Sequence, residues 1–297
     1  MSDATIQKVT VVLVTYNSKE VVGSALKSIP EGASIIVVDN ASRDGTVEYI
    51  QEHFSQVKLI VMPENIGFGP ANNVALERVK TPFSLLMNPD ACFIESGTIN
   101  QLLSAAVCYP DAAILAPGII DENGVVQRTL PAPLMRRRQM NKNSSFSMGD
   151  VVGDTCSFSL SGALMLLRMS AFVDAEYFFD PNIFMYFEDD DICMSSRARG
   201  YTTILIPSAK VMHLVGRSSP PGLEIEALKL RHKTFSQLYV MAKYGKSDES
   251  LEKARRMLRK NRLRLFLSLL FFQHGQALFS RSRCDGAVAF LASRDAH

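Results

Sequence analysis

Short apolar runs alternate with amphipathic stretches over the first part of the chain. The apolar runs are predicted to be buried strands, at 9–16, 34–40, 57–63 and 83–90, and the first three contain several β-branched residues. Helix-patterned stretches lie between them, at 18–29 (with Ser18 as the expected N-cap), 45–54 and 69–79. Strands joined by helical crossovers favour an α/β fold with an open, mostly parallel, Rossmann-like sheet flanked by helices.

The pattern continues less regularly to the end of the chain. Further elements are predicted as a helix at 98–108, a strand at 112–120, a strand and helix at 160–172, and a strand at 201–214. The stretch 131–158 is polar, and a connection of that length is usually a functional lid or disordered. Beyond about residue 222 the chain is helical and basic. The expected domains are therefore 1–219 and a C-terminal helical region at 220–297.

Polar residues stand at the carboxyl ends of the predicted strands, where open α/β sheets bind ligands. Asp39 ends the second strand in IIVVDNAS. A carboxylate there can accept a hydrogen bond from a nucleobase imide or a ribose hydroxyl. The equally weighted alternative is that Asp39 or Asn40 only caps the following turn.

Candidate metal ligands end two other strands. Asn88 and Asp90 lie in LLMNPD, and strand alternation predicts that both side chains point the same way. Asp90 is a candidate ligand for a divalent cation that bridges a diphosphate, but NPD is also an ordinary turn sequence. His213 ends the last strand. A lone histidine is more often structural, yet a neutral imidazole can complete a metal site with Asp90.

The stretch ENIGFGPANN at 64–73 places two glycines before a helix. Glycines there allow the backbone to approach a ligand closely, because they have no side chain. The stretch lacks the GxGxxG fingerprint of dinucleotide-binding sites, so a dehydrogenase loses its main support.

Four consecutive acids, Glu188 to Asp191, directly follow the aromatic residues Phe184, Tyr186 and Phe187. Burial against apolar surface disfavours the charged carboxylate, which raises its pKa and suits a general base. The alternative is a solvated helix start, because acids are favoured in a first helical turn.

Composition narrows the classes of function. The 297 residues are 47% hydrophobic, enough for a large core, and a net charge of +2 argues against a nucleic-acid partner. The five cysteines include no CxxC pair and are expected to be reduced intracellular thiols. No export signal is visible, and the longest apolar run, 265–272, is too short to span a bilayer. A cytoplasmic protein is expected, with peripheral contact at the inner face of the cell membrane as an open option.

Several stretches, taken in order, resemble the family-2 glycosyltransferases of the GT-A fold, particularly the bacterial rhamnosyltransferase-like branch. They cover about 9–219 and read VVLVTYNS, VVDNASRDGT, ENIGFGPANN, LLMNPD, SGALMLLR, FFDPNIFMYFEDDDIC and AKVMHLVGRSS. The resemblance implies that Tyr16 and Asp39 hold the nucleobase and its ribose, with Thr15 and Asn17 beside them. The remaining expected donor contacts are Asn65, Gly67, Asn88 and, in the loop 215–222, Arg217.

The resemblance also implies a Mg²⁺ or Mn²⁺ site on Asp90 and His213. Asn88 stands where the family's DxD-type motif has its first acid, so this chain has one firm carboxylate there. In the Glu188–Asp189 pair, the aspartate matches the catalytic base. Pro70 departs from the family pattern, in which a small flexible residue is common.

The implied activity is inverting, metal-dependent transfer of a sugar, with rhamnose as a candidate, in cell-surface polysaccharide synthesis. The donor would be a dTDP- or UDP-linked sugar, and the acceptor a hydroxyl of a saccharide or polyprenyl-linked glycan. One rival is a sugar-nucleotide pyrophosphorylase, which should carry a glycine-rich, arginine-containing loop where TYNSKE stands. The other is a non-catalytic nucleotide- or glycan-binding relic, against which the intact Asp39, Asp90, Asp189 and His213 argue.

The C-terminal region has a basic stretch, 251–264, that runs directly into the apolar 265–272. Basic residues beside apolar ones fit an interfacial helix on an anionic membrane. The alternative is that the apolar residues pack on the catalytic domain or on a second subunit.

Overall fold

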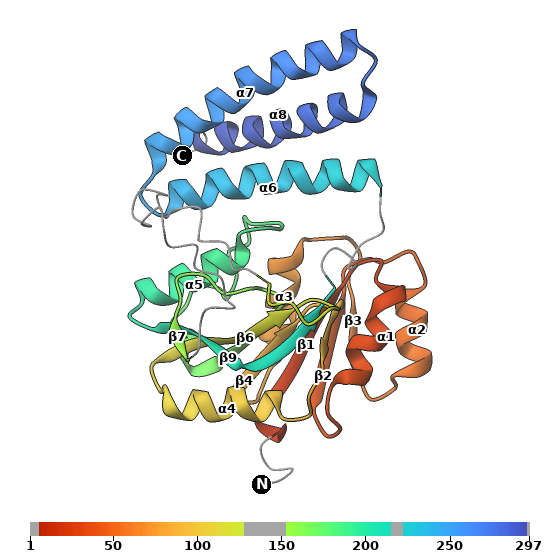
Figure 1. Cartoon of the computed structure of the whole chain (residues 1–297), viewed down its shortest axis with the longest axis vertical. Helices are drawn as coiled ribbons and strands as arrows, with labels where there is room; N and C mark the ends of the chain where they lie inside the picture. Colours follow the sequence, from red (N-terminus) through yellow and green to blue (C-terminus); the bar gives the residue numbers. More distant parts are fainter. Residues whose placement is uncertain (1–5, 128–152, 215–221, 296–297) are drawn as a thin grey trace. The chain divides into compact units, whose positions relative to one another are not determined.

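The computed structural model describes residues 6–127, 153–214 and 222–295. These form two compact units (Figure 1). The first unit holds 6–127, 153–182 and 189–214, and the second holds 183–188 and 222–295. The short segment 183–188 thus groups with the C-terminal helices, although the sequence interpretation assigned it to the catalytic domain.

The first half of the first unit alternates strands and helices as predicted. The elements are β1 (Val9–Thr15), α1 (Lys19–Ser28), β2 (Ser34–Asp39), α2 (Thr46–His53), β3 (Lys58–Val61), α3 (Phe68–Leu76) and β4 (Phe83–Met87). Ser18 occupies the N-cap position of α1, as expected. The fourth strand is shorter than predicted, because it ends at Met87 and the residues after it turn.

The rest of the first unit contains shorter and less regular elements. They are β5 (Ala91–Phe93), α4 (Thr98–Cys108), β6 (Ala112–Ile120), β7 (Thr155–Cys156), β8 (Leu164–Arg168), the 3-10 helix η3 (Met169–Phe172), α5 (Glu188–Ala198) and β9 (Thr202–His213). The sequence pattern missed β5 and β7, which have only three and two residues. Strands this short are too brief to show a periodic signal.

The described strands form one sheet in the order β3-β2-β1-β4-β8-β6-β9-β5, with β7 paired to β9. The pairs among β3, β2, β1 and β4 are parallel, as expected from helical crossovers. The sheet as a whole is mixed, because β8 lies antiparallel between β4 and β6, and β5 lies antiparallel to β9. The predicted Rossmann-like α/β fold is confirmed, with parallel pairing concentrated in its N-terminal half.

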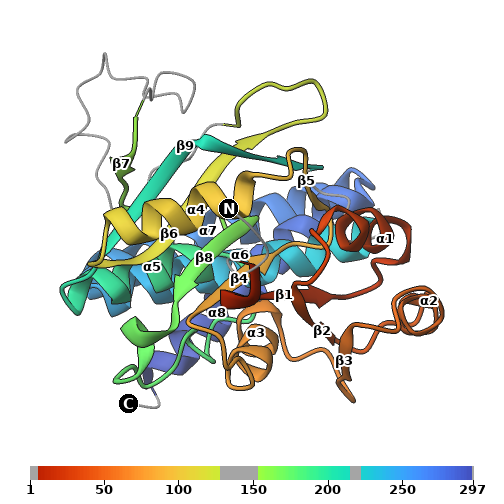
Figure 2. The ribbon, with the colours of Figure 1, turned by 90° about the horizontal axis from the view of Figure 1, so that it is seen from below.

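Alternate residues along the strands face two separate cores, as the pleat requires. Val9, Val11 and Leu13 of β1 pack in one core with residues of α1 and α4. Val12 and Val14 pack in the other with residues of α3, η3 and α5. Figure 2 shows α1 and α4 on one side of the sheet and α3 on the other. Burial on both faces explains why β1, β2 and β4 read as continuous apolar runs.

The second unit contains α6 (Leu223–Lys243), α7 (Ser247–Leu270) and α8 (His274–Asp295), which pack on one another. Its core is formed by Leu238, Ala254, Ala287 and Phe290. Gly286 allows α8 to approach α6 closely, since a Cβ atom there would lie 2.3 Å from the carbonyl oxygen of Arg231. Among the described helices, none is both long and apolar enough to cross a membrane.

Candidate active site

The carboxyl ends of the parallel strands collect polar residues at one edge of the sheet. Thr15, the last residue of β1, lies in register with Asp39, the last residue of β2. Asn88 and Asp90 follow β4, which is parallel to β1. His213 ends β9 and lies in register with Ala91, the residue after Asp90. Residues that are distant in sequence thus meet at the strand ends, where open α/β sheets bind ligands.

The Asp39 carboxylate is completely buried and held by the chain itself. It accepts hydrogen bonds from the Thr15 hydroxyl (2.9 Å), the Ser42 amide (2.8 Å) and the Ser42 hydroxyl (2.5 Å). A carboxylate has about four acceptor positions, so these bonds leave it with further capacity. Asp39 is therefore a rigid acceptor at the base of the candidate donor site, and Thr15 orients it.

Tyr16 and Asn17 follow β1 and behave differently. Tyr16 is 38% exposed and offers a ring on which a planar base can stack. Asn17 donates its backbone N–H to the Ser42 hydroxyl and accepts from the Arg43 amide, each at 2.8 Å. Asn17 thus anchors the loop after β2. Both Asn17 and Ala41 have positive φ, 52° and 66°, a strained conformation that is concentrated at functional sites.

Asn40 clamps the glycine loop before α3 to the end of β2. Its side-chain N–H₂ donates to the Asn65 side-chain oxygen (2.8 Å) and to the Gly67 carbonyl (3.1 Å), and its oxygen accepts from the Ile66 amide (3.0 Å). Gly67 has φ 97°, which favours glycine. The sequence interpretation gave Asn40 only a turn-capping role. Its side-chain bonds instead join segments about 25 residues apart.

Asp90 and His213 form a buried pair. Oδ1 of Asp90 lies 3.2 Å from Nε2 of His213, and the Asp90 side chain has no exposed surface. The backbone fixes the pair, because the Leu214 amide donates to the Asp90 carbonyl at 2.9 Å. Gln127 donates its side-chain amide to the His213 carbonyl at 3.0 Å. The two predicted metal residues are therefore adjacent in the fold.

Several polar atoms around this pair lack hydrogen-bond partners among the described residues. They are Oδ1 of Asn88, Nδ1 of His213 and both carboxylate oxygens of Asp90, of which Oδ1 lies within ion-pair distance of His213 Nε2 but makes no hydrogen bond within the described part of the chain. Buried polar atoms normally have hydrogen-bond partners, so atoms that lack one within the protein indicate a site for a bound water or ion. Two oxygen-bearing side chains and one imidazole suit Mg²⁺ or Mn²⁺, which complete their shells with water and phosphate oxygens. The described residues contain no cluster of three or more His, Cys, Asp or Glu that could hold a metal alone.

The predicted alternation of Asn88 and Asp90 along a strand is wrong. The strand ends at Met87, and the Ala91 amide donates to the Asn88 carbonyl at 3.1 Å, closing a turn. The turn is the alternative that the NPD sequence also favours. The unpartnered Asn88 and Asp90 oxygens therefore lie in a turn between β4 and β5.

The acidic block begins α5. Asp189 is partly buried and accepts from the Gly162 amide (3.2 Å) and the Asp190 amide (2.9 Å). Burial raises the pKa of Asp189, and the two amides oppose that shift. Gly162 allows this contact, since a Cβ atom there would lie 3.3 Å from the Cβ of Asp189. Glu188, the neighbouring candidate, ends the short segment of the second unit.

Asp190 is a second perturbed acid that the sequence interpretation did not single out. It accepts a 2.5 Å hydrogen bond from the Ser159 hydroxyl. Burial, together with the charge of Asp189, raises the pKa of Asp190 to about 7, although the hydrogen bond from Ser159 acts to lower it. Perturbed acids of this kind are candidates for functional sites. The sequence showed four equivalent acids, and only their packing distinguishes them. Arg217 lies outside the described residues.

Two residues immediately before α5, Tyr186 and Phe187, also have positive φ, 65° and 66°. Such values are genuine outliers for aromatic residues. These two residues directly precede the acidic start of α5. They form a second site of backbone strain near a predicted functional residue, after Asn17 and Ala41.

Comparison with known proteins identifies the family of the chain. Residues 10–173 match the model of glycosyl transferase family 2. The N-acetylglucosaminyl-diphospho-decaprenol L-rhamnosyltransferase of Mycobacterium tuberculosis is 28% identical over 238 residues, covering 68% of this chain and 75% of that protein. The teichoic acid poly(glycerol phosphate) polymerase of Staphylococcus epidermidis is 30% identical over 91 residues, covering 28% of this chain and 13% of that protein.

Two solved structures share the fold at low sequence identity. The mannosyltransferase PcManGT of Pyrobaculum calidifontis, in complex with GDP-Man and Mn²⁺, has a TM-score of 0.57 and 17% identity, covering 97% of this chain and 75% of that one. Residues 1–349 of Staphylococcus aureus TarS have a TM-score of 0.54 and 15% sequence identity, covering 98% of this chain and 92% of that one. The GT-A fold expected from the sequence is thereby confirmed. The family match extends over more than half of the chain, and the chain belongs to glycosyl transferase family 2.

Proposed function

We propose that this glycosyltransferase moves a sugar, with rhamnose the first candidate, from a dTDP- or UDP-linked donor to a lipid-linked saccharide during cell-surface polysaccharide synthesis. The similarity to the mycobacterial rhamnosyltransferase supports the sugar and the lipid-linked acceptor. The enzyme would work in the cytoplasm, with its C-terminal helices at the inner face of the cell membrane.

The donor nucleotide would lie over the ends of β1 and β2. The rigid Asp39 carboxylate accepts a hydrogen bond from the base or ribose, and the exposed Tyr16 ring stacks beside it. Thr15 and Asn17 support these two residues through their own hydrogen bonds. Asn65 and Gly67, which Asn40 holds by hydrogen bonds, would contact the donor from the loop before α3.

The observation that carries the proposal is the buried Asp90–His213 pair with its unpartnered atoms. Asp90 and His213 would hold a divalent cation, with the Asn88 oxygen nearby. When bound, such a cation neutralises the charge that develops on the leaving diphosphate. The mannosyltransferase PcManGT was solved with Mn²⁺, which supports the use of a divalent metal here.

Asp189 would act as the general base in a single displacement. Its carboxylate takes the proton from the acceptor hydroxyl, while that oxygen bonds to the anomeric carbon of the donor sugar. The bond from this carbon to the diphosphate oxygen breaks, and the nucleoside diphosphate leaves with the electron pair. Attack from the face opposite the leaving group inverts the anomeric configuration. The burial-raised pKa of Asp189 strengthens the carboxylate as a base.

A donor screen tests this proposal. The full chain is incubated with Mn²⁺ and each of a panel of dTDP-, UDP- and GDP-linked sugars, and release of the nucleoside diphosphate is measured. A synthetic polyprenyl-diphospho-N-acetylglucosamine is then added as acceptor. We expect one donor to dominate and the acceptor to accelerate release, with a product of inverted configuration by NMR. Formation of a nucleoside triphosphate and a sugar phosphate in a parallel incubation with pyrophosphate would indicate a pyrophosphorylase, and a product of retained configuration would exclude the single displacement.

A further inference from the structure

The end of α7 carries a concentration of exposed apolar side chains. The apolar tip, as we call it, consists of Leu263, Phe266, Leu267, Leu269, Leu270, Phe271 and Phe272. These residues are from 42% to 81% exposed, with Phe272 the most exposed. Single exposed apolar residues are ordinary on protein surfaces. A group of large ones in one place instead marks a surface that contacts a membrane or another molecule.

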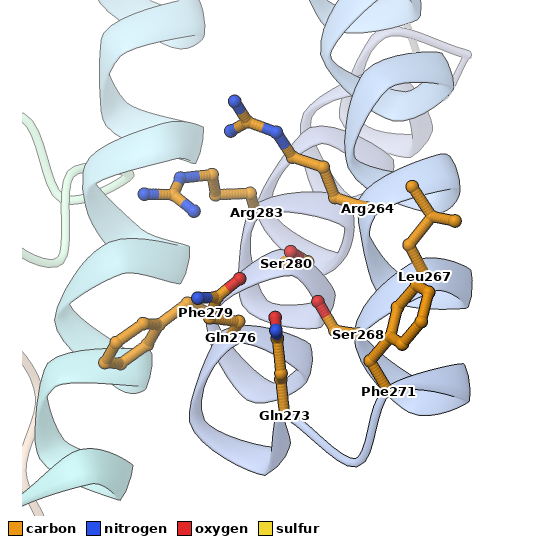
Figure 3. A pocket seen from close by; sticks show the side chains of 9 residues that line it. All are labelled: Arg264, Leu267, Ser268, Phe271, Gln273, Gln276, Phe279, Ser280 and Arg283. Carbon is orange, nitrogen blue, oxygen red and sulfur yellow. The ribbon is translucent and has the colours of Figure 1, made fainter.

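A pocket of about 520 Å³ opens between α7 and α8 beside this tip, and it shares Leu267 and Phe271 with it (Figure 3). Its polar lining includes Arg264 of α7 and Arg283 of α8, with the hydroxyls of Ser268 and Ser280. In Figure 3 the two arginine side chains extend toward the same side of the pocket. The pocket thus combines two guanidinium groups and two hydroxyls with an apolar rim.

The pocket is positively charged without an internal counterion. No aspartate or glutamate is among the described residues that line it. Burial and the positive charge of Arg264 lower the pKa of Arg283, so the two cations repel each other. Two arginines beside hydroxyl donors are the typical recognition set for a phosphate group. An anion in the pocket would relieve the repulsion.

We propose that the apolar tip enters the interface of an anionic membrane and that the Arg264–Arg283 pocket binds the phosphate of a lipid headgroup there. This inference rests on the membrane contact included in the proposed function. It specifies which residues make the contact and which chemical group they recognise. The geometry matches an interfacial anchor, in which apolar side chains are shallowly buried and basic ones lie at headgroup level.

Charge favours a membrane over a second copy of the chain as the occupant. The turns of α7 that precede the tip expose further basic side chains: Arg255, Arg256, Arg259, Lys260 and Arg262. Two copies joined through their tips would bring these basic surfaces together, whereas an anionic leaflet complements them. The apolar tip therefore has a partner of stated chemistry, an anionic phospholipid surface.

Vesicle binding tests the inference with the full chain. The protein is sedimented with vesicles of phosphatidylcholine alone or with phosphatidylglycerol, without nucleotide sugar. We expect binding to the anionic vesicles that weakens as salt rises. The tip variant Phe271→Ser/Phe272→Ser and the pocket variant Arg264→Gln/Arg283→Gln should each lower the partition coefficient by about tenfold or more, from lost apolar burial and lost headgroup attraction respectively.

Matched controls separate the surface from general effects. Arg255→Gln/Arg256→Gln removes the same charge from α7 away from the pocket, and Val107→Ser removes an exposed apolar residue of the first unit. The arginine control should bind anionic vesicles more tightly than the pocket variant, and Val107→Ser should bind them more tightly than the tip variant. Arg264→Gln alone, at an exposed side chain, repeats the pocket test if the double variant does not fold.

Three outcomes would overturn the inference. They are equal binding to neutral and anionic vesicles, equal loss in the pocket variant and its charge-matched control, or a lipid-free dimer that the tip variant converts to monomer. Because no donor is present, failure of sugar transfer leaves the vesicle result unaffected. An Asp189→Asn protein should sediment like the wild type, so the two proposals fail independently.

Discussion

The ring of Phe184 stacks on the ring of His232, with 4.2 Å between their centroids. The Ser236 hydroxyl of α6 also donates to the Met185 carbonyl at 2.8 Å, and Lys233 lies over the Tyr186 ring. All of these contacts lie within the second unit. The chain that leads into the acidic helix is therefore held by α6, even though Asp189 itself belongs to the first unit.

If this segment positions the base, His232→Ala should lower kcat by about tenfold, since small displacements of a catalytic group are costly. The donor KM should stay within about twofold of the wild type, as expected for a residue that acts only through the base. His232→Phe keeps a ring to stack and should restore most of the activity. Glu224→Ala, an exposed change on the same helix, is the control. Equal activity in His232→Ala and wild type would refute the positioning role.

Asp189→Asn should lower transfer by about 10²-fold or more, because an amide cannot accept the acceptor's proton. Donor affinity, measured by calorimetry with Mn²⁺, should change little. Asp190→Asn is the matched control, since it alters the adjacent acid and retains an oxygen that accepts from Ser159. Near-normal turnover in Asp189→Asn, with loss in Asp190→Asn, would assign the base to Asp190.

Asp190 should make stability depend on pH. Its ionised form is disfavoured in the folded state, so its pKa is raised from 3.8 to about 7. The resulting loss of folding stability is absent below the pKa that Asp190 has in the unfolded chain. The loss grows as pH rises and is complete above about pH 7. Asp190→Asn should therefore raise the melting temperature more at pH 8 than at pH 5, as measured by circular dichroism. A gain that is the same at both pH values would contradict the assigned cause.

Removing the cation should abolish transfer. Excess EDTA should reduce nucleoside diphosphate release to background, and added Mn²⁺ should restore it. Asp90→Ala should cost about 10²-fold or more, because it removes the buried carboxylate that faces the site. His213→Ala should cost less and raise the Mn²⁺ concentration required for half activity. Undiminished activity in EDTA would remove the metal from the mechanism.

Gly286→Ala should destabilise the C-terminal unit by about 1–3 kcal/mol, the usual cost of overpacking. The added methyl would lie 2.3 Å from the Arg231 carbonyl oxygen, so α8 and α6 would have to separate. Gly275→Ala is the control in the same helix, where the nearest atom is a Leu223 side-chain carbon at 3.8 Å. Urea unfolding should show a loss only for Gly286→Ala, and equal stability of both variants would exclude the tight approach.

Local patterns were sufficient to predict much of the fold and part of the site. Continuous apolar runs, β-branched in β1 and β2, predicted β1, β2 and β4, because burial on both faces removes polar positions from a strand. Asp39 and His213 were correctly placed at strand ends, because polarity changes abruptly where the buried run stops. These predictions depend only on neighbours in sequence. The roles of the site residues in catalysis stay predictions.

Tertiary structure decided the rest, because the relevant contacts join distant segments. Asp90 meets His213 only through the antiparallel pairing of β5 with β9, and β5 is too short to be recognised by periodicity. The Asn40 side chain joins the end of β2 to the loop before α3, and only the folded chain brings these two segments together. The four acids at 188–191 look alike in sequence, and the raised pKa values of Asp189 and Asp190 come from burial and neighbouring groups that only the folded chain supplies. Likewise, only packing shows that most of 265–272 is exposed, since apolar sequence has the same appearance whether a core or a partner covers it.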